Sequence, residues 1–481
     1  MTVGEFADLV SQQLQHNPTS QQRALIQALA RFCASSTPYN SVFILNGYAG
    51  TGKTSVVAAL VNALTLMRRG VVMLAPTGRA AKVMATISGR KAFTIHRKIY
   101  QGDSLAGDFR APAHNPHSDT IFIVDEASMI GATEGENLLD DLIHYVYSGD
   151  NCRMILVGDT AQLPPVGCTD APAMEPDNLR RYGLKVAKAT MTQTVRQRRQ
   201  SAILANATLM RKAQEELAKN DDAVGADDVA AAGEENVEKA PESFNSLLII
   251  SDTDVKTIPG EELEEWLSDA YRNDGVDNTI LITRSNKRAM QFNLAIRRQI
   301  LDKERDLTEG EPLLICKNNY FITSKIKGAD FLANGEIARI EAIYGYENRS
   351  FLRFADVALY LPDRDLTIDA KLLLNTLNSE TAGLSDEYEQ LLYRIAMADL
   401  PQEHHADRNR VARHLKTHPY YQALRVKYAY ALTCHKAQGG QWPNVFVDLG
   451  GIAPAATNTL DYLRWLYTAT TRATTRLYYL Q

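Results

Sequence analysis

A glycine-rich loop between a predicted strand and a predicted helix constrains this chain more than any other segment. Residues 44–55 read ILNGYAGTGKTS, which matches G-x-x-x-x-G-K-[ST] completely. The apolar run at 42–45 suits a buried strand, and residues 55–67 have helical apolar spacing. Glycines without a Cβ let backbone N–H groups surround a phosphate at the start of a helix. The segment therefore predicts an α/β sheet with a nucleoside triphosphate at its edge.

Positions within this loop have separate expected roles. Lys53 can reach the β- and γ-phosphates, and the Thr54 hydroxyl can take one Mg²⁺ position. The rest of the phosphate cradle consists of Gly47, Ala49, Gly50, Thr51, Gly52 and Ser55. The loop alone does not say what nucleotide binding drives.

The bulk composition predicts a soluble protein of two to four domains. The 481 residues contain no run near the roughly 18 apolar residues that a membrane span needs. The N-terminus lacks a basic region followed by an apolar core, so we expect no secretory signal. The five cysteines are scattered and odd in number, without a C-x-x-C pair, so we expect no disulfide framework. The cytoplasm is therefore the expected location.

The net charge of −5 does not exclude a nucleic-acid partner. Residues 211–242 hold ten acidic and four basic side chains, so they contribute −6 and the rest of the chain carries +1. A near-neutral body can still present a basic groove. The acidic, alanine-rich segment has few large apolar residues, and we predict a flexible insertion over 211–243.

Two α/β blocks flank that insertion. Short apolar runs that suit parallel strands recur at 42–45, 71–74, 121–124 and 154–157, and again at 247–250, 279–283 and 445–449. Helical stretches separate them, and 459–471 also has a helical pattern. Residues 313–425 interrupt the second block. They begin with alternating apolar and polar residues, typical of antiparallel strands, and continue as polar helices from about 370 to 418.

Paired carboxylates end one of the predicted strands. Asp125 and Glu126 follow four apolar residues, 72 positions after Lys53. Hydrolysis of a nucleoside triphosphate uses one carboxylate to hold the Mg²⁺ shell and another to orient or deprotonate water. Gln162 follows the next strand end, in GDTAQLPP, where an amide can bond a γ-phosphate or its water. For Gln162 alone, a polar turn closed by prolines is an equal interpretation.

The full series of motifs resembles one family. In order, the chain carries NPTSQQ, GYAGTGKTS, LAPTGRAAKVM, TIHRKI, IVDEASM, LVGDTAQLPPVG, TVRQ, ALTCHKAQGGQW and LYTATTRA. This series resembles the superfamily 1B DNA helicases, specifically the RecD-like/Dda-like group. The resemblance implies two RecA-like P-loop domains with parallel sheets, at 1–99 with 120–210 and at 244–312 with 426–481. It also implies a β-hairpin pin at 100–119 and an accessory SH3-like β plus helical domain at 313–425.

The resemblance also assigns roles to residues on both cores. Gln22 is similar to a glutamine that reads adenine, which implies ATP with Mg²⁺, the latter held by Thr54 and Asp125. Arg196 and Arg472 are similar to two arginines that reach the γ-phosphate, and Gln438 and Gly439 to residues that link nucleotide to DNA.

Further residues are implied to grip DNA through its backbone. They are Thr77, Arg79, Lys82, Thr94 and His96 of the first core, and Thr433, His435 and Lys436 of the second. Hydroxyl, imidazole and ammonium groups suit phosphates and carry no base code. Phe109, within the implied pin, and Trp442 are candidates for stacking on bases, although either can instead be a side chain packed against the core.

These implications predict an ATP-dependent DNA helicase that acts as a monomer on single-stranded DNA and duplex junctions, without a membrane partner. The 5′→3′ direction comes from the resemblance alone. An RNA helicase and a P-loop switch that remodels a protein partner remain as alternatives, because phosphate contacts rarely distinguish the two sugars. A zinc site at His404, His405, His414 and His418 is disfavoured, since neither a cysteine pair nor an H-E-x-x-H motif accompanies them.

The pin assignment makes a testable prediction. Base–aromatic stacking contributes about 1–3 kcal/mol per base, so we expect Phe109→Ala to slow strand separation while DNA-stimulated ATP hydrolysis persists. A helicase assay on a forked duplex and a phosphate-release assay would be run in parallel. Unwinding at the wild-type rate would show that Phe109 is not a separation wedge.

Overall fold

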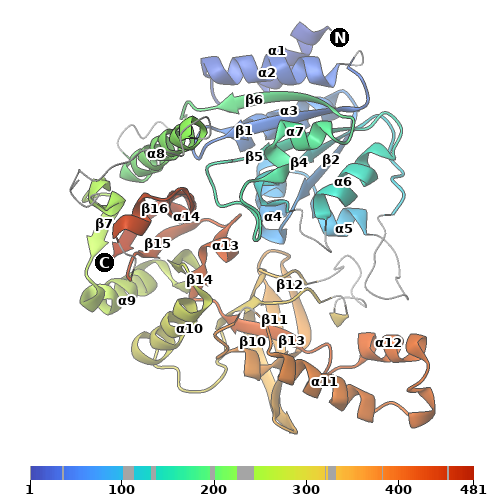
Figure 1. Ribbon diagram of the computed structural model, residues 1–481, viewed down its shortest axis with the longest axis vertical. Coiled ribbons are helices and arrows are strands. Elements are labelled where there is room, and N and C mark those ends of the chain that lie inside the picture. The colour runs from blue at the N-terminus through green and yellow to red at the C-terminus, as the bar shows by residue number, and fades with distance from the viewer. Residues whose placement is uncertain are drawn as a thin grey trace.

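The computed structural model consists of two α/β units and a β-barrel (Figure 1). It describes residues 2–34, 37–100, 113–131, 137–194, 201–224, 243–319, 321–322, 332–381, 383–451 and 454–481. In Figure 1 the first α/β unit lies above the second, and the barrel lies below both, with two helices extending from it.

A six-stranded parallel sheet forms the first unit, in the order β3-β2-β4-β5-β1-β6. Its strands are β1 Ser41–Gly47, β2 Gly70–Ala75, β3 Ala92–Thr94, β4 Thr120–Val124, β5 Arg153–Gly158 and β6 Lys185–Met191. Its helices are α1 Val3–Gln12, α2 Ser20–Cys33, α3 Lys53–Leu66, α4 Gly78–Ser88, α5 Ile95–Ile99, α6 Leu138–Tyr147 and α7 Pro176–Arg180.

The side chains of β1 point alternately to the two faces of the sheet, which explains why residues 42–45 are all apolar. Phe43 and Leu45 pack into a core with α1, α2 and α3, whereas Val42 and Ile44 pack into a second core with α5 and α6. Successive strand residues point to opposite faces, and helices cover both faces of this sheet. The central strands therefore have no polar face.

A five-stranded parallel sheet forms the second unit, in the order β14-β8-β15-β16-β7. Its strands are β7 Val255–Ile258, β8 Thr279–Thr283, β14 Ala431–Thr433, β15 Trp442–Asp448 and β16 Ala473–Leu480. The associated helices are α8 Ala202–Val224, α9 Leu263–Asp274, α10 Asn286–Ala295, α13 Cys434–Ala437 and α14 Leu460–Thr470. Together the two sheets confirm the predicted α/β class.

The inserted region forms a closed barrel in the order β10-β11-β12-β13-β9. Its strands are β9 Pro312–Ile315, β10 Ile337–Arg349, β11 Leu352–Leu361, β12 Leu366–Leu373 and β13 Leu424–Tyr428, and two helices follow β12, α11 Asp386–Ala398 and α12 Arg408–Thr417. The predicted antiparallel β unit is thus present. Phe109 and most of the expected pin, residues 101–112, lie outside the described residues.

Two boundaries of the inserted region differ from the prediction. Residues 370–373 were expected to begin the helical part, but they form the end of β12, where Leu372 pairs with Leu424. The barrel also continues past residue 425, because Val426 and Tyr428 pair with β9. Burial of alternate side chains in the barrel outweighs the polar composition that suggested a helix.

The expected strand at 247–250 is absent from the described second sheet. A 3₁₀ turn, Phe244–Leu247, occupies its start, and the edge strand is instead β7. The Asn206 side chain of α8 accepts from the Ile249 N–H at 2.7 Å and donates to the Ile249 carbonyl at 2.8 Å. These bonds satisfy the backbone without a strand partner.

The acidic segment predicted to be flexible begins inside a helix. Residues 211–224 continue α8, which starts at Ala202. The buried apolar side chains Ile203, Ala207 and Met210 precede residue 211, and among the described side chains the buried Gln214 continues their face. The acidic segment itself therefore has no apolar periodicity that would predict a helix. Gln214 donates to the Ala161 carbonyl at 3.2 Å, which ties the helix to the first unit.

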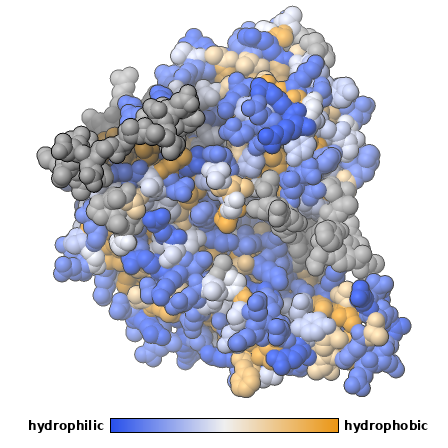
Figure 2. Space-filling model, in the orientation of Figure 1, coloured by the Kyte–Doolittle hydropathy of each residue, from blue (hydrophilic) through white to orange (hydrophobic). Residues whose placement is uncertain are grey.

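A membrane-spanning helix must be both long and apolar. None of the described helices combines the length and the apolar character needed to cross a bilayer. The face in Figure 2 is mainly hydrophilic, with apolar residues in scattered groups.

A buried ion pair fixes the barrel to the second α/β unit. Arg297 lies in the π-helical turn Ile296–Ile300 that continues α10, and Glu311 immediately precedes β9; they are 3% and 0% exposed. The guanidinium contacts Glu311 at 2.5 Å, and the Tyr430 hydroxyl donates to the same carboxylate at 3.0 Å. Removing one partner leaves a buried charge without compensation.

We therefore expect Glu311→Ala to lower the free energy of unfolding by about 3–5 kcal/mol, measured by urea denaturation. Asp269→Asn is a matched control, because its pair with Arg272 is exposed and contributes at most about 1 kcal/mol. Equal effects of the two substitutions would contradict a structural role for the buried pair.

Candidate nucleotide site and nucleic-acid interface

The glycine-rich loop joins β1 to α3 at the carboxyl edge of the first sheet. Gly50 and Gly52 have left-handed backbones, with φ of 78° and 82°, which favour glycine. A Cβ at Gly47 would meet the Lys53 side chain at 2.7 Å. No side chain among the described residues caps the start of α3, so its first N–H groups remain available to an anion.

Lys53 folds back over this loop. Its ammonium donates to the Gly47 carbonyl and to the Tyr48 carbonyl, the latter at 3.1 Å. It also lies 4.0 Å from Asp159 Oδ2. A side chain held above the loop by weak neutral acceptors can turn toward a phosphate, which accepts more strongly.

The Asp-Glu pair lies at the end of β4, as predicted. Glu126 has a left-handed backbone, with φ of 52°, and its N–H donates to Asp125 Oδ1 at 2.9 Å. Burial and the neighbouring Glu126 carboxylate raise the pKa of Asp125, while Lys53 acts in the opposite direction. A strained non-glycine residue and two crowded carboxylates are features of a functional site.

The turn after β5 holds Asp159 and Gln162. Asp159 is buried and accepts from the Ala161 N–H at 3.1 Å. Gln162 is also buried, and its Oε1 has no hydrogen-bond partner in the described part of the chain. A buried amide oxygen without a partner destabilises the fold, so Gln162 fits a role toward a bound group.

Gln22 combines a structural bond with an unused donor. Its Oε1 accepts from the Thr19 N–H at 3.0 Å in a capping box that starts α2. The side chain is fully buried, yet Nε2 lacks a partner within the described ranges. The free donor fits an acceptor on the edge of a base. Gln22, Gln162 and the glycine loop together fit a nucleoside triphosphate.

The second unit contacts this site directly. Gln438 donates to the Leu163 carbonyl at 2.8 Å, and the Thr468 hydroxyl accepts from the Leu163 N–H at 2.8 Å. Gly439 has a φ of 72°, and a Cβ there would lie 3.2 Å from the Thr77 hydroxyl. The HKAQGG segment therefore lies against both the turn after β5 and the start of α4.

Of the two arginines predicted to reach the γ-phosphate, the structure describes one. Arg472 is buried, and its guanidinium donates within the second unit to the carbonyls of Thr468 and Gly440, at 2.9 and 3.2 Å. Arg196 lies outside the described residues.

One predicted stacking side chain is not available. Trp442 is 4% exposed, and the Arg79 guanidinium lies 3.9 Å above its ring. Arg79 also donates to the Gln441 carbonyl at 3.2 Å. Of the two interpretations of Trp442, the structure therefore favours the side chain packed against the core, because Arg79 of the first unit covers its ring.

The other predicted nucleic-acid residues lie on or just before α4, α5 and α13, and two of them contact the barrel. Thr77 and Thr94 cap the starts of α4 and α5, and Thr433 precedes α13, where His435 is exposed. Lys82 contacts the barrel turn after β11, through the Pro362 carbonyl and Asp363 at 3.9 Å.

Two further side chains complete this set. Lys436 donates to Asn334 of the barrel at 2.5 Å, and the His96 ring lies 5.7 Å from that of Tyr100. The predicted grip residues thus come from both α/β units, and two of them, Lys82 and Lys436, contact the barrel.

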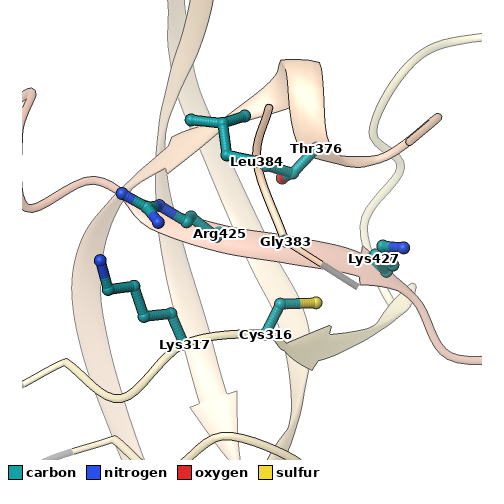
Figure 3. A pocket seen from close by; sticks show the side chains of 7 residues that line it. All are labelled: Cys316, Lys317, Thr376, Gly383, Leu384, Arg425 and Lys427. Atoms are coloured by element: carbon teal, nitrogen blue, oxygen red, sulfur yellow. The ribbon is translucent and has the colours of Figure 1, made fainter. Parts of the chain in front are cut away.

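A cavity of about 220 Å³ lies in the barrel beside β13 (Figure 3). Its basic lining residues are Lys317, Arg425 and Lys427. Arg425 pairs with Glu389 at 2.7 Å, and Lys427 donates to the Ser379 carbonyl at 3.0 Å. Glu389 lies on α11 and Ser379 lies between β12 and α11, so these two contacts attach the helical part of the insertion to β13 of the barrel.

The histidine cluster is structural. His414 bonds the Ala396 carbonyl at 2.8 Å, and His418 bonds Asp399 at 3.0 Å, so both join α12 to α11. No group of three or more metal-ligating side chains occurs among the described residues.

Sequence analysis did not single out Asp159 or Tyr467, although both lie in motifs that it quoted. Tyr467, on α14, donates to Asp159 Oδ2 at 2.7 Å and accepts from the Ala49 N–H at 2.9 Å. Only the pairing of the two units reveals these bonds, because the residues are 308 positions apart.

Two family models match the sequence. The AAA domain matches residues 18–232, and the UvrD-like helicase C-terminal domain matches residues 428–480. The chain is 37% identical over 123 residues to the ATP-dependent RecD2 DNA helicase of Deinococcus radiodurans, covering 26% of this chain and 16% of that protein. It is 24% identical over 312 residues to the ATP-dependent DNA helicase dda of Enterobacteria phage T4, covering 62% and 63%.

These matches show that the chain is similar to ATP-dependent DNA helicases over the ranges given. It spans less than two thirds of the length of these curated relatives. Solved Pif1 helicases align with most of it at low similarity. The Bacteroides protein in complex with ADP-AlF3 and ssDNA is 14% identical with a TM-score of 0.46, covering 96% and 92% of the chains. The Candida albicans protein is 15% identical with a TM-score of 0.41, covering 97% and 95%.

The unused Nε2 donor of Gln22 predicts that this side chain contributes to ATP binding. Gln22→Glu keeps the oxygen that caps α2 but replaces the unused Nε2 donor with an acceptor. Loss of a buried hydrogen bond costs about 1–3 kcal/mol, so we expect the KM for ATP to rise about tenfold or more. Gln21→Glu is the matched control, because the Gln21 oxygen accepts from Thr192 and Gln193 outside the site. A KM unchanged in Gln22→Glu would remove Gln22 from the base pocket.

Proposed function

We propose that this protein is an ATP-dependent DNA helicase that moves 5′→3′ along single-stranded DNA and separates duplexes. One observation carries the proposal: Tyr467, Thr468 and Gln438 of the second unit bond directly to the phosphate loop and the turn after β5. A change in the phosphates can therefore move one unit relative to the other. The direction rests on the resemblance of the motif series to superfamily 1B helicases.

The residues of the first core divide the hydrolytic work. Thr54 and Asp125 would hold Mg²⁺, and Lys53 would leave its loop carbonyls for the β- and γ-phosphates. Glu126 would orient the attacking water and accept its proton, and Gln162 would direct its unpaired oxygen to that water. When bound, Mg²⁺ neutralises charge on the phosphoryl oxygens. From the other side, Arg196 and Arg472 would stabilise the charge of the transferring group.

The proposed DNA path follows the junction of the two cores and the barrel. Hydroxyl, imidazole and ammonium groups would line this path. They belong to Thr77, Lys82, Thr94, His96, Thr433, His435 and Lys436. Their chemistry suits phosphates of any sequence, which a translocating motor requires. Lys82 and Lys436 both contact barrel residues, so the barrel adjoins this path.

An RNA helicase remains the nearest alternative, because backbone contacts alone do not read the 2′-hydroxyl. A protein-remodelling switch is less well supported. It does not need basic and hydroxyl groups gathered from two cores.

Two substitutions in the nucleotide site should give different defects. Lys53→Ala removes the cation for the phosphates, so we expect loss of nucleotide affinity and of turnover. Glu126→Gln keeps the side-chain volume but removes the base, so we expect ATP to bind while hydrolysis falls about 10²–10⁴-fold. Fluorescent-nucleotide binding and steady-state phosphate release measure the two effects. Wild-type hydrolysis in either variant would contradict the site.

The direction and the nucleic acid can be tested together. Duplexes with a 5′ tail or a 3′ tail, each in DNA and RNA forms, are incubated with protein and ATP. We expect unwinding of the 5′-tailed DNA substrate only. Unwinding of the 3′-tailed substrate would contradict the direction, and ATP hydrolysis indifferent to single-stranded DNA would contradict the helicase itself.

A further inference from the structure

The Tyr467 hydroxyl is buried between the two cores. Tyr467 lies on α14 of the second unit and is 1% exposed. Its oxygen accepts from the Ala49 N–H of the phosphate loop at 2.9 Å and donates to Asp159 Oδ2 at 2.7 Å. Both partners belong to the first unit, so one hydroxyl of the second unit contacts two separate loops of the first.

The surroundings keep this hydroxyl protonated. Burial and the Asp159 carboxylate raise the pKa of Tyr467 well above its ordinary value. A neutral phenol can donate to the carboxylate and accept from the amide at the same time. Asp159 Oδ2 also lies 4.0 Å from the Lys53 ammonium. The hydroxyl is therefore connected to the loop backbone and, through Asp159, to the phosphate-binding cation.

The next residue extends the connection to Arg472. The Thr468 hydroxyl accepts from the Leu163 N–H, beside Gln162, at 2.8 Å, and the Thr468 carbonyl accepts from Arg472 Nε at 2.9 Å. One turn of α14 thus touches both loops of the first core and holds the arginine of the second.

We propose that Tyr467 is a positioning residue that couples the phosphate loop to the second core. This inference rests on the proposed function for its consequence, but not for its geometry. Movement of α14 away from the first core would break both bonds at once and leave a buried carboxylate oxygen without its donor. The junction therefore favours discrete arrangements over gradual displacement.

Hydrogen exchange tests the geometry without any activity. Tyr467→Phe removes only the hydroxyl, so we expect the amide exchange of a peptide spanning residues 46–52 to rise about tenfold. Tyr479→Phe is the matched control, because the buried Tyr479 hydroxyl bonds Thr470 within the second unit at 2.8 Å. Equal exchange in the wild type and Tyr467→Phe would overturn the proposal.

Steady-state kinetics test the consequence. In Tyr467→Phe we expect the DNA-stimulated kcat to fall about tenfold, the KM for ATP to change less than about threefold, and thermal stability to match that of Tyr479→Phe. A purely structural tyrosine would lower stability in both variants and leave kcat unchanged, which would overturn the coupling. If the wild type shows no DNA-stimulated hydrolysis, the proposed function fails, while the exchange measurement still decides the role of Tyr467.

Discussion

The parallel pairing of β1, β5 and β4 places three loops at one edge of a sheet, and the chemistry of the molecule depends on that arrangement. The loop after β1 supplies the phosphate cradle, the loop after β4 supplies Asp125 and Glu126, and the loop after β5 supplies Asp159 and Gln162. Carboxyl ends of parallel strands meet at the same edge, so residues distant in sequence converge without long connections. Helices on both faces hold the strands in register.

The second unit matters because it completes this edge. Gln438, Tyr467 and Thr468 meet the loops after β1 and β5, while Arg79 of the first unit covers Trp442 of the second. Apolar packing accompanies these hydrogen bonds, because Ala161 and Leu163 of the first unit lie in the same buried cluster as Trp465 and Leu466 of the second. The junction therefore combines directional bonds at the nucleotide loops with apolar contact beside them.

Much of the fold could be predicted from local patterns, because buried parallel strands and glycine loops have clear signatures. The run at 42–45, the Asp-Glu pair and the helix near 459–471 all depend on neighbouring residues alone. The errors and the open alternatives arise where a distant partner decides. Asn206 satisfies the backbone of Ile249 in place of a strand, and Arg79 closes the face of Trp442. In α8 the buried apolar stripe ends at Met210, and the buried amide of Gln214 continues it into the acidic segment, where no apolar pattern indicated a helix.

In the site, too, local sequence indicated some residues, while others depend on partners distant in the chain. Motifs identified the loop residues, whereas the Tyr467 bond to Asp159 joins positions whose proximity no periodicity reveals. The unpaired donor of Gln22 likewise becomes evident only from its burial.

The barrel has a consequence for the order in which the chain folds. It interrupts the sequence between β8 and β14, although these strands are neighbours in the second sheet. Its first and last strands, β9 and β13, pair with each other. A folded barrel therefore holds its entry and exit points together and replaces a long chain closure with a short one. We expect the barrel to form early, so that the second sheet can close around its two ends.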